Sequence, residues 1–293
     1  MGFPELLQFT FAGLKNGAVY ALLALGFTIV YASTGVINFA QGEFYMLGGM
    51  LAAFLFAAYG LPLPFAAVGA VAVAAGVGVV FELLAIRPRK DGDPLALIII
   101  TVGGSILIKA LSRHVFGPDE VSMPVFTRGA SLEVAGARLE LQTLWIWGLT
   151  ATTVAALTFL YRRTAFGRAM RACAVNRRAA RIVGVDTRTM VMASFGLAAA
   201  LGALGGLAVT PLTQMRFDAG SSVALKGFAA AILGGLGSPV AAVVGGVVLG
   251  LLESMSIAFL SSTYKDAVAL VVLLAVLFMR PQGLLGRARR EKL

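Results

Sequence analysis

The feature that most constrains this chain is a series of apolar stretches that approach the length needed to cross a lipid bilayer. A membrane-spanning helix needs about 20 mostly apolar residues. The six clearest stretches are 65–86, 95–111, 141–160, 190–209, 240–260 and 267–279. Two more, 9–31 and 39–59, qualify despite polar interruptions. The chain is therefore predicted to cross a membrane eight times, or nine times if the shorter, glycine-broken stretch 221–236 also spans.

The composition supports the same architecture. Hydrophobic residues make up 59% of the 293 residues and charged residues only 13%, and the mean hydropathy is +0.89. A soluble domain of this size needs a larger charged fraction to cover its surface. The 35 glycines let helix backbones approach closely in lipid. We predict an all-α fold, a single polytopic membrane helical bundle over 1–293, with about eight to ten transmembrane helices and a glycine-broken segment in each half.

Few residues are available for metal or disulfide chemistry. Cys173 is the only cysteine and His114 the only histidine, which excludes an internal disulfide framework and a His-rich metal site. The apolar stretches hold no His, no Cys and no close pair of carboxylates, which disfavours an intramembrane enzyme. We expect no cofactor, no metal and no catalytic residues.

Basic residues predict the orientation of the bundle. The connector 162–188 holds eight Arg against one acid, Asp186, and the segments 87–90 and 280–293 together hold another eight Lys or Arg. By the positive-inside rule all three segments face the cytoplasm. The N-terminus is then outside, 113–140 forms an external loop, and the tail 280–293 is cytoplasmic. This topology accounts for the net charge of +10 without a nucleic-acid partner, because the Arg are not interleaved with exposed aromatic residues.

A polar segment interrupts the second apolar stretch. Between Gly35 and Gly42 the chain carries Asn38 and Gln41, and Glu43 follows directly. Polar groups at membrane depth usually face a cavity or another helix, and the flanking glycines permit unwound backbone of the kind that transporters use at binding sites. A second interpretation is a helix start at the interface, with Asn38 as cap and Glu43 in the first turn. Both interpretations are compatible with a polar lining of a solute path.

A second interruption lies in the other half of the chain. The segment 227–239 contains four glycines, Ser238 and Pro239, and its alignment with 39–53 at an offset of 189 gives a weak internal repeat. Paired glycine-interrupted segments point to a transport pathway, whereas close packing through small residues is the alternative. Ser221 and Ser222 either contribute to the path from this half or cap the next helix. For Lys226, snorkelling to the interface is favoured over pairing with a carboxylate. An even number of crossings between Arg188 and Arg280 requires 221–236 to cross, or another stretch not to.

The basic connector shows helical periodicity. Small and apolar residues recur at i, i+3 and i+4 from Ala169 to Cys173 and again from Ala179 to Val183, with an interruption near Asn176 and an end at Gly184. This pattern indicates an amphipathic helix on the cytoplasmic side. Periodicity alone favours anionic lipid as its contact over the groove of a partner protein.

These segments together resemble one family. The segment 37–43 resembles the first-half signature of branched-chain amino-acid ABC importer permeases, 167–172 and 182–186 resemble their cytoplasmic coupling loop, and 231–238 resembles their second-half glycine motif. The segments occur in the family's order, and 13–24 and 280–284 extend the resemblance over most of the chain. The shorter of the two permeases of such systems is the most similar subtype. An acidic residue common in relatives near 175–178 is absent here.

The resemblance implies a subunit that carries a small polar solute, a branched-chain amino acid or a related molecule, across the bacterial inner membrane. Its implied partners are a second permease subunit, two cytoplasmic ATPase subunits, a periplasmic solute-binding protein and membrane lipid. The chain has no Gly-Lys dipeptide and hence no phosphate-binding P-loop, so ATP hydrolysis requires a separate subunit. That requirement favours partner docking for the connector. The residues expected to couple to the ATPase are Arg171, Asn176, Arg177, Arg178, Ala179, Arg181 and Gly184.

Two other transport mechanisms stay open from the residues alone. In a secondary transporter driven by an ion gradient, Glu43 is the carboxylate that binds the ion, and the Arg-rich connector only sets the topology. A passive channel needs a filter motif, and none is visible. In the importer, the predicted first-half lining of the path is Asn38, Gln41 and Glu43, with Ser221 and Ser222 from the second half.

Overall fold

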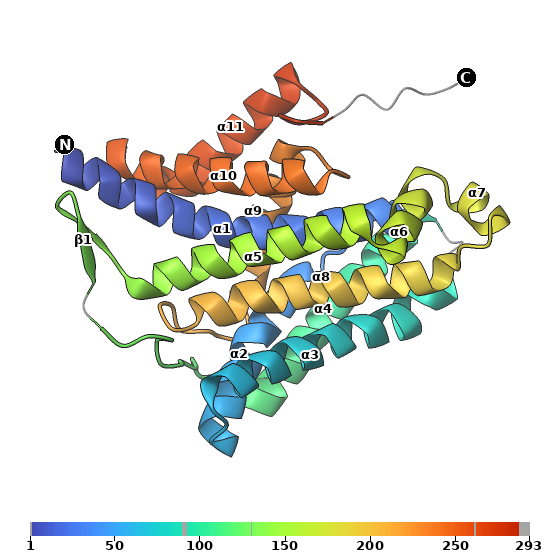
Figure 1. The fold of residues 1–293 in the computed structure, drawn as a ribbon, viewed down its shortest axis with the longest axis horizontal. Coiled ribbons are helices and arrows are strands. Elements are labelled where there is room, and N and C mark those ends of the chain that lie inside the picture. Colours follow the sequence, from blue (N-terminus) through green and yellow to red (C-terminus); the bar gives the residue numbers. More distant parts are fainter. Residues whose placement is uncertain (1, 90–92, 130, 261, 287–293) are drawn as a thin grey trace.

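The computed structural model describes residues 2–89, 93–129, 131–260 and 262–286, and these form a helical bundle (Figure 1). The helices are α1 (Phe3–Thr34), α2 (Gln41–Tyr59), α3 (Leu63–Phe81), α4 (Pro94–Phe116), α5 (Leu141–Arg163), α6 (Ala165–Val175), α7 (Arg177–Ile182), α8 (Thr187–Val209), α9 (Ala219–Gly234), α10 (Pro239–Phe259) and α11 (Lys265–Met279). The predicted fold class, an all-α polytopic membrane bundle, is confirmed.

Seven helices in the described part of the chain are long and apolar enough to cross a membrane. They are α1, α2, α3 with its continuation to Arg89, α4, α5, α8 and α10. The eight clear crossings predicted from the sequence become seven by this measure, because 267–279 falls in α11, which has only 15 residues. At 1.5 Å per residue such a helix spans about 22 Å, less than the hydrocarbon core. The stretch 221–236 corresponds to α9, with 16 residues.

The external loop predicted at 113–140 begins later and contains a small hairpin. Helix α4 continues to Phe116, and strands β1 (Leu132–Val134) and β2 (Ala137–Leu139) pair in antiparallel register. The two turn residues, Ala135 and Gly136, both have positive φ (50° and 81°), which matches the twist of a tight two-residue hairpin. The hairpin contacts the start of the chain, where the Arg138 N–H donates to the Gln8 side-chain oxygen at 2.8 Å.

The two halves of the chain form an inverted repeat. Helix α2 packs against α8 as α9 packs against α1, and α3 packs against α8 as α10 packs against α1. The colours of Figure 1 show α1 and α8 running in opposite directions through the middle of the bundle. The start of α2 at Gln41 corresponds to the start of α9 at Ala219. The weak repeat at an offset of 189 was therefore misaligned, since the equivalent helix starts lie 178 residues apart.

Small residues set the distance between the most intimately packed helices. The backbone of α1 at Gly17 lies against α10 at Gly250, and a side-chain carbon at either position would meet the other helix's backbone. Without a hydrophobic driving force between helices in lipid, such close backbone contact is a main source of association. Helices α1 and α8 form the buried centre, while α4 and α5 lie at the periphery with mostly exposed apolar side chains.

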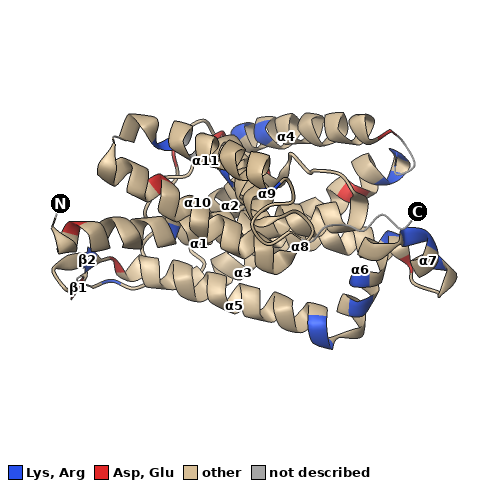
Figure 2. Cartoon of the chain, turned by 90° about the horizontal axis from the view of Figure 1, so that it is seen from above, with Lys and Arg blue, Asp and Glu red and all other residues tan. Residues whose placement is uncertain are grey.

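The two ends of the bundle differ in charge. Figure 2 shows Lys and Arg gathered on α6, α7 and the segment that precedes α4, at the end opposite to the N-terminus and the hairpin. The described C-terminal segment lies at the C-terminal end of α9, where the Leu284 N–H donates to the Leu233 carbonyl at 2.8 Å. We call the two ends the hairpin end and the arginine end.

Candidate translocation site

The corner between α1 and α2 is unwound. Helix α1 ends at Gly35, whose φ of 75° suits glycine and whose N–H donates to the Tyr31 carbonyl at 2.7 Å. The chain then continues without helix to Gln41, and the Phe39 N–H donates to the Thr101 hydroxyl of α4 at 3.2 Å. The predicted unwinding between Gly35 and Gly42 is thus present over the six residues 35–40, and a side chain of a neighbouring helix satisfies part of the freed backbone.

Asn38 stabilises this corner and also lines a small cavity. Its side-chain oxygen accepts from the Ala40 N–H at 3.1 Å, which stabilises the turn before α2. The helix cap considered for Asn38 is not present, because Ala40 is the N-cap residue of α2 and no side chain caps that helix start. Its side-chain nitrogen is buried and has no hydrogen-bond partner among the described residues. The cavity beside it has a volume of about 10 Å³ and is also lined by Thr34 and Thr101, which is room for one water molecule.

Gln41 joins α2 to the centre of the bundle. Its side-chain nitrogen donates to the Ala198 carbonyl of α8 at 2.8 Å, and the side chain packs against Gly26 of α1. Its side-chain oxygen is buried without a partner in the described part of the chain. An amide that is half satisfied in this way is costly at membrane depth, and its position next to Asn38 places two unsatisfied polar atoms near the start of α2.

Glu43 is the centre of a polar cluster from three helices. One carboxylate oxygen accepts from the Ser105 hydroxyl of α4 at 2.9 Å and from the Ser221 hydroxyl of α9 at 3.2 Å. Lys109 of α4 donates to Ser221 at 2.6 Å. The second carboxylate oxygen is buried and has no partner among the residues described. We call Glu43, Ser105, Lys109 and Ser221 the Glu43 cluster.

The Glu43 cluster forms where the two half-repeats cross. The backbones of Gly42 and Gly220 touch, so that a side chain on either residue would collide with the other's carbonyl. Each glycine is the second residue of its helix, and the positive ends of two helix dipoles therefore meet beside one carboxylate. The structure brings Glu43 and Ser221 together as the sequence suggested. Ser222 points away, is exposed, and donates to the Ala219 carbonyl at 3.1 Å.

The glycine segment 227–239 is less broken than expected. Residues up to Gly234 are helical in α9, and only the four residues 235–238 leave the helix, among them Gly235 and Gly237 with φ of 121° and 93°. The Ser238 hydroxyl then caps α10 by accepting from the Ala241 N–H. The second half of the site is therefore built by the start of α9, eight residues before the glycine motif begins.

A second buried carboxylate, Glu253 of α10, was not identified from the sequence. It forms an ion pair with Lys226 of α9 and accepts from the Tyr20 hydroxyl of α1 at 2.6 Å. The expectation that Lys226 snorkels to the interface is wrong, because its ammonium pairs with this carboxylate. A single acid within the apolar stretch 240–260 was the available signal, and intramembrane acids usually have partners.

The connector at the arginine end folds as two helices with an extended corner. Thr164 caps α6 through the Gly167 N–H at 3.0 Å, and Asn176 caps α7 through the Ala179 N–H at 3.0 Å. Gly184, with φ of 86°, ends the segment. The predicted interruption at Asn176 and the predicted end at Gly184 are both present.

The connector packs its small face against its own chain. Met170, Cys173 and Ala180 are buried in the main hydrophobic cluster, so these side chains are not available to a partner. Burial raises the pKa of the Cys173 thiol. The side chains of Val175, Ile182 and Val183 are exposed instead, Ile182 by 85%. Arg171, Arg178, Ala179 and Arg181 are also exposed.

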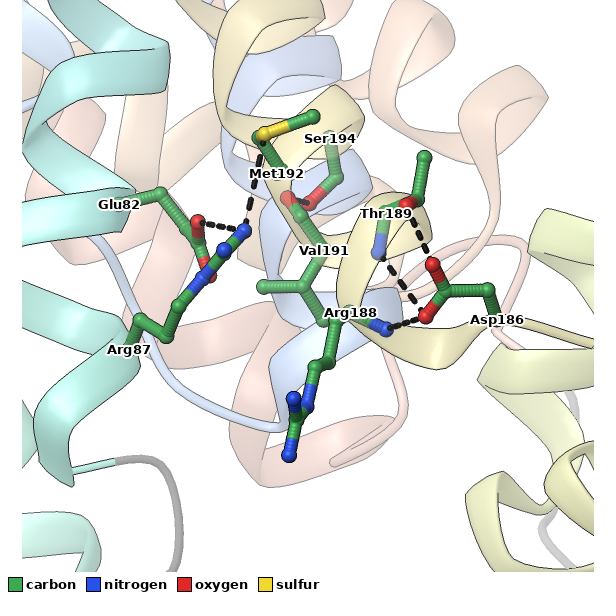
Figure 3. A network of polar contacts seen from close by, with 8 residues as sticks. All are labelled: Glu82, Arg87, Asp186, Arg188, Thr189, Val191, Met192 and Ser194. Carbon is green, nitrogen blue, oxygen red and sulfur yellow. Dashed lines mark hydrogen bonds and ion pairs between the residues drawn. The ribbon is translucent and has the colours of Figure 1, made fainter.

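Asp186 caps the helix that leaves the connector. Its carboxylate accepts from the Thr189 hydroxyl at 2.5 Å and from the Arg188 N–H at 2.9 Å, as Figure 3 shows. These two hydrogen bonds hold the pKa of the Asp186 carboxyl below its ordinary value. Within the described residues, no group of three or more His, Cys, Asp or Glu is placed to hold a metal ion.

Comparisons with known proteins agree on one family. The family model described as branched-chain amino acid transport system / permease component matches residues 9–277. The chain is 34% identical to the high-affinity branched-chain amino acid transport system permease protein LivH of Escherichia coli, over 99% of this chain and 98% of that protein. It is 33% identical to the corresponding permease protein BraD of Pseudomonas aeruginosa, over 99% of each. The solved structure of PsaBC from Streptococcus pneumoniae in complex with Fab has a similar fold, with a TM-score of 0.51 at 12% identity over 92% of this chain and 91% of that one.

Proposed function

The chain belongs to the family of permease components of branched-chain amino acid transport systems, and from that premise we propose which solute it carries and which residues line the path. It is a multi-pass permease subunit of an ABC transport system, as its resemblance indicated. The named solute of its relatives, a branched-chain amino acid, is the solute we assign to it. The Glu43 cluster is the observation that carries this assignment.

An amino acid presents one ammonium and one carboxylate, and the Glu43 cluster offers a partner for each. The buried, unpartnered oxygen of Glu43 suits an ammonium. Lys109 and the starts of α2 and α9 supply positive charge and N–H groups for a carboxylate, the arrangement transporters use at broken helices. Asn38 and Gln41 extend this lining on the side of α2. A branched aliphatic side chain adds no charge and leaves this pairing intact.

The path lies on a face of this chain that a second permease subunit covers. Ser221 and Lys109 are half-buried and Ser222 is exposed, and Lys109 lies about 10 Å before the end of α4. Polar side chains at such depth are not stable against lipid. A second permease, a paralogue of this chain, supplies the cover and the other wall of the path.

The arginine end faces the cytoplasm and engages the ATPase. The side chains of Val175, Ile182 and Val183 are apolar and exposed, and we call them the tip of the connector. Exposed apolar side chains of this kind are more stable in the groove of a partner protein than in water. The coupling residues around the tip are Arg171, Asn176, Arg177, Arg178, Ala179, Arg181 and Gly184. Two ATPase subunits, one for each permease, and an external solute-binding protein at the hairpin end complete the importer, with the N-terminus outside and the inner membrane as its location.

The test is uptake by proteoliposomes that contain the complete importer. Glu43→Gln removes the charge but keeps the size of the side chain, and uptake of leucine should fall at least about tenfold, because a charge-assisted hydrogen bond is worth roughly 1.5–3 kcal/mol. Subunit assembly should be unchanged. Glu140→Gln, an exposed carboxylate before α5, is the matched control and should transport normally. Normal uptake by Glu43→Gln would remove Glu43 from the path, and uptake without ATP would favour the secondary transporter.

A further inference from the structure

A cleft of about 370 Å³ opens at the arginine end, between the end of α3, helix α7 of the connector and the start of α8. Five arginines and one acid line it: Arg87, Arg177, Arg178, Arg181, Arg188 and Glu82. We call it the arginine cleft. No residue of the Glu43 cluster lines it. Three of its arginines, Arg177, Arg178 and Arg181, are also proposed coupling residues, whereas Arg87 and Arg188 have no role in the proposed transport.

One of the five guanidinium groups is neutralised inside the chain. Helix α3 widens into a π-helical turn, Glu82–Ile86, and continues as a 3-10 turn, Arg87–Arg89. This turn folds the Arg87 guanidinium back onto the buried Glu82 carboxylate at 3.1 Å, as Figure 3 shows. Glu82 is the one acidic residue in the described lining, and its carboxylate is already paired with Arg87.

The other four guanidinium groups have no ion-pair partner in the described part of the chain. Asp186 is the nearest acid in sequence, but its carboxylate is turned toward the start of α8, while the Arg188 guanidinium points away from it in Figure 3. Arg181 has only a long contact of 3.5 Å with the Thr187 hydroxyl. Four like charges around one cleft repel each other, and an anion in the cleft relieves that repulsion.

The rest of the lining indicates the kind of anion. Apolar side chains of Ile86, Leu97 and Val191 also line the cleft, and the neighbouring outer surfaces of α3 and α4 expose Leu84 and Leu95. A cleft that combines guanidinium groups with apolar side chains suits an amphiphilic ligand, one with an anionic head and an apolar tail. Guanidinium forks match phosphate oxygens in geometry, and basic pockets between transmembrane helices at the cytoplasmic side bind anionic lipid headgroups.

We propose that the arginine cleft binds the phosphate headgroup of an anionic phospholipid from the cytoplasmic leaflet. The proposal rests on the proposed orientation of the arginine end but not on the transported solute. A lipid held between α3, α4 and α7 would tie the connector to the membrane surface at the point where the ATPase is expected to push. The same phosphate chemistry in a free anion is the alternative source, and the experiment separates the two.

The experiment is native mass spectrometry of the full chain purified in detergent and titrated with phosphatidylglycerol or phosphatidylethanolamine. We expect one phosphatidylglycerol to bind roughly tenfold or more tightly than phosphatidylethanolamine, because each cation near an anionic headgroup contributes about 1 kcal/mol. The cleft variant, which should lose this preference, is Arg177→Gln/Arg178→Gln/Arg188→Gln. The matched control, which removes the same charge from the same end outside the cleft and should keep the preference, is Arg162→Gln/Arg163→Gln/Arg168→Gln.

Several outcomes decide the proposal. An equal loss in both triple variants would overturn it, because it would show diffuse attraction to a basic surface. No preference for phosphatidylglycerol in the unmodified chain would also overturn it. Displacement of the lipid by millimolar inorganic phosphate, with phosphate retained, would assign the cleft to a free anion and overturn the lipid. Should the cleft variant unfold, the single change Arg188→Gln, whose side chain forms no hydrogen bond within the described residues, replaces it and should weaken binding about fivefold. Lipid binding is measured without ATPase or solute, so failure of the proposed transport function leaves this result intact.

Discussion

Glu43 and Glu253 are both buried among the helices, and their partners distinguish their roles, whereas the buried Glu82 pairs with Arg87 at the arginine end. Glu253 has an ion pair with Lys226 and a hydrogen bond from the Tyr20 hydroxyl, so both of its oxygens are engaged. Glu43 has only hydroxyl donors, on one oxygen. A fully partnered acid stabilises the structure, whereas an acid with a bare oxygen can bind a ligand. This contrast is why Glu43, and not Glu253, is assigned to the path.

The Lys226–Glu253 ion pair should stabilise the fold, and removing the charge of Lys226 should cost more unfolding free energy than removing the charge of Glu253. Lys226→Met leaves Glu253 buried without its cation, which should lower the free energy of unfolding by about 3 kcal/mol. Glu253→Gln should cost less, because the Lys226 side chain is 27% exposed and can reach more polar surroundings. The double variant should recover part of the loss. Thermal unfolding of the four proteins in detergent measures the coupling, and additive losses would contradict a direct pair.

The contact between Gly42 and Gly220 should tolerate no side chain. Gly220→Ala places a methyl group against the Gly42 carbonyl, and overpacking of this kind typically costs about 1–3 kcal/mol. It should also separate Ser221 from Glu43 and reduce uptake. Gly103→Ala is the matched control, since it lies in α4 with open space around the position. Unchanged thermal stability and uptake of Gly220→Ala would show that the two half-helices are not held in contact.

At this scale the sequence predicted the polar residues but not their partners. Asn38, Gln41 and Glu43 were identifiable because polar groups between glycines stand out in an apolar stretch. The contacts of Gln41 and Glu43 come from Ala198 and Ser105, which are ordinary residues of distant helices, and Asn38 accepts only from the nearby Ala40 N–H. Lys226 was assigned to the interface because its partner, Glu253, lies 27 residues away. The hydropathy pattern of a sequence predicts how deep in the membrane a residue lies, but it does not predict which helix packs against that residue.

The connector illustrates what an element's pattern can and cannot determine. Its helical character, the interruption near Asn176 and the end at Gly184 followed from the local pattern and are present, whereas the role of Asn176 as the cap of a separate helix did not follow. Which side faces outward did not follow, because Ala180 and Ala179 are equally small, and only packing against α8 buries the first. Elements shorter than the membrane were also hard to assign, since α9 and α11 depend on neighbouring helices rather than on their own length.

The exposed tip of the connector should be required for ATPase binding. Ile182→Asp places a charge on a side chain that is 85% exposed, so the fold should persist while association with the ATPase weakens. Ala179→Trp should clash with a fitted groove at a typical cost of about 1–3 kcal/mol. If the tip instead lies on lipid, the tryptophan should strengthen membrane attachment.

The measurement is co-purification of the ATPase together with solute-stimulated ATP hydrolysis. Val134→Asp is the control, because it makes the same kind of change on an exposed side chain of the hairpin at the other end. It should leave both quantities unchanged. If Ile182→Asp and Ala179→Trp also leave them unchanged, the connector is not the coupling element.

At the scale of the whole molecule, the inverted repeat explains why the site lies where it does. Helices α2 and α9 enter the bundle from opposite ends and both begin inside it, next to α1 and α8. A non-helical segment precedes each of these helices, and the first turns that follow these segments contain Gly42 and Gly220. The position of the site therefore follows from the inverted repeat. The difference in charge between the two ends, seen in Figure 2, bears only on the orientation of the bundle in the membrane.

The proposed orientation of the bundle rests on that charge asymmetry and can be tested on intact cells. Cysteines at Arg89 and Arg178, both at the arginine end, should be shielded from an impermeant thiol reagent until the membrane is opened, whereas a cysteine at Glu133 in β1 should react at once. The physical basis is the retention of Lys and Arg on the cytoplasmic side during insertion. The natural Cys173 is buried, and replacing it with serine removes the remaining background. One spanning helix, α4, lies between Arg89 and Glu133, and one, α5, lies between Glu133 and Arg178. If both helices cross the membrane, the orientation of the bundle therefore determines the reactivity of all three cysteines. Reaction at Arg178 from outside would invert the topology and move the ATPase site to the hairpin end.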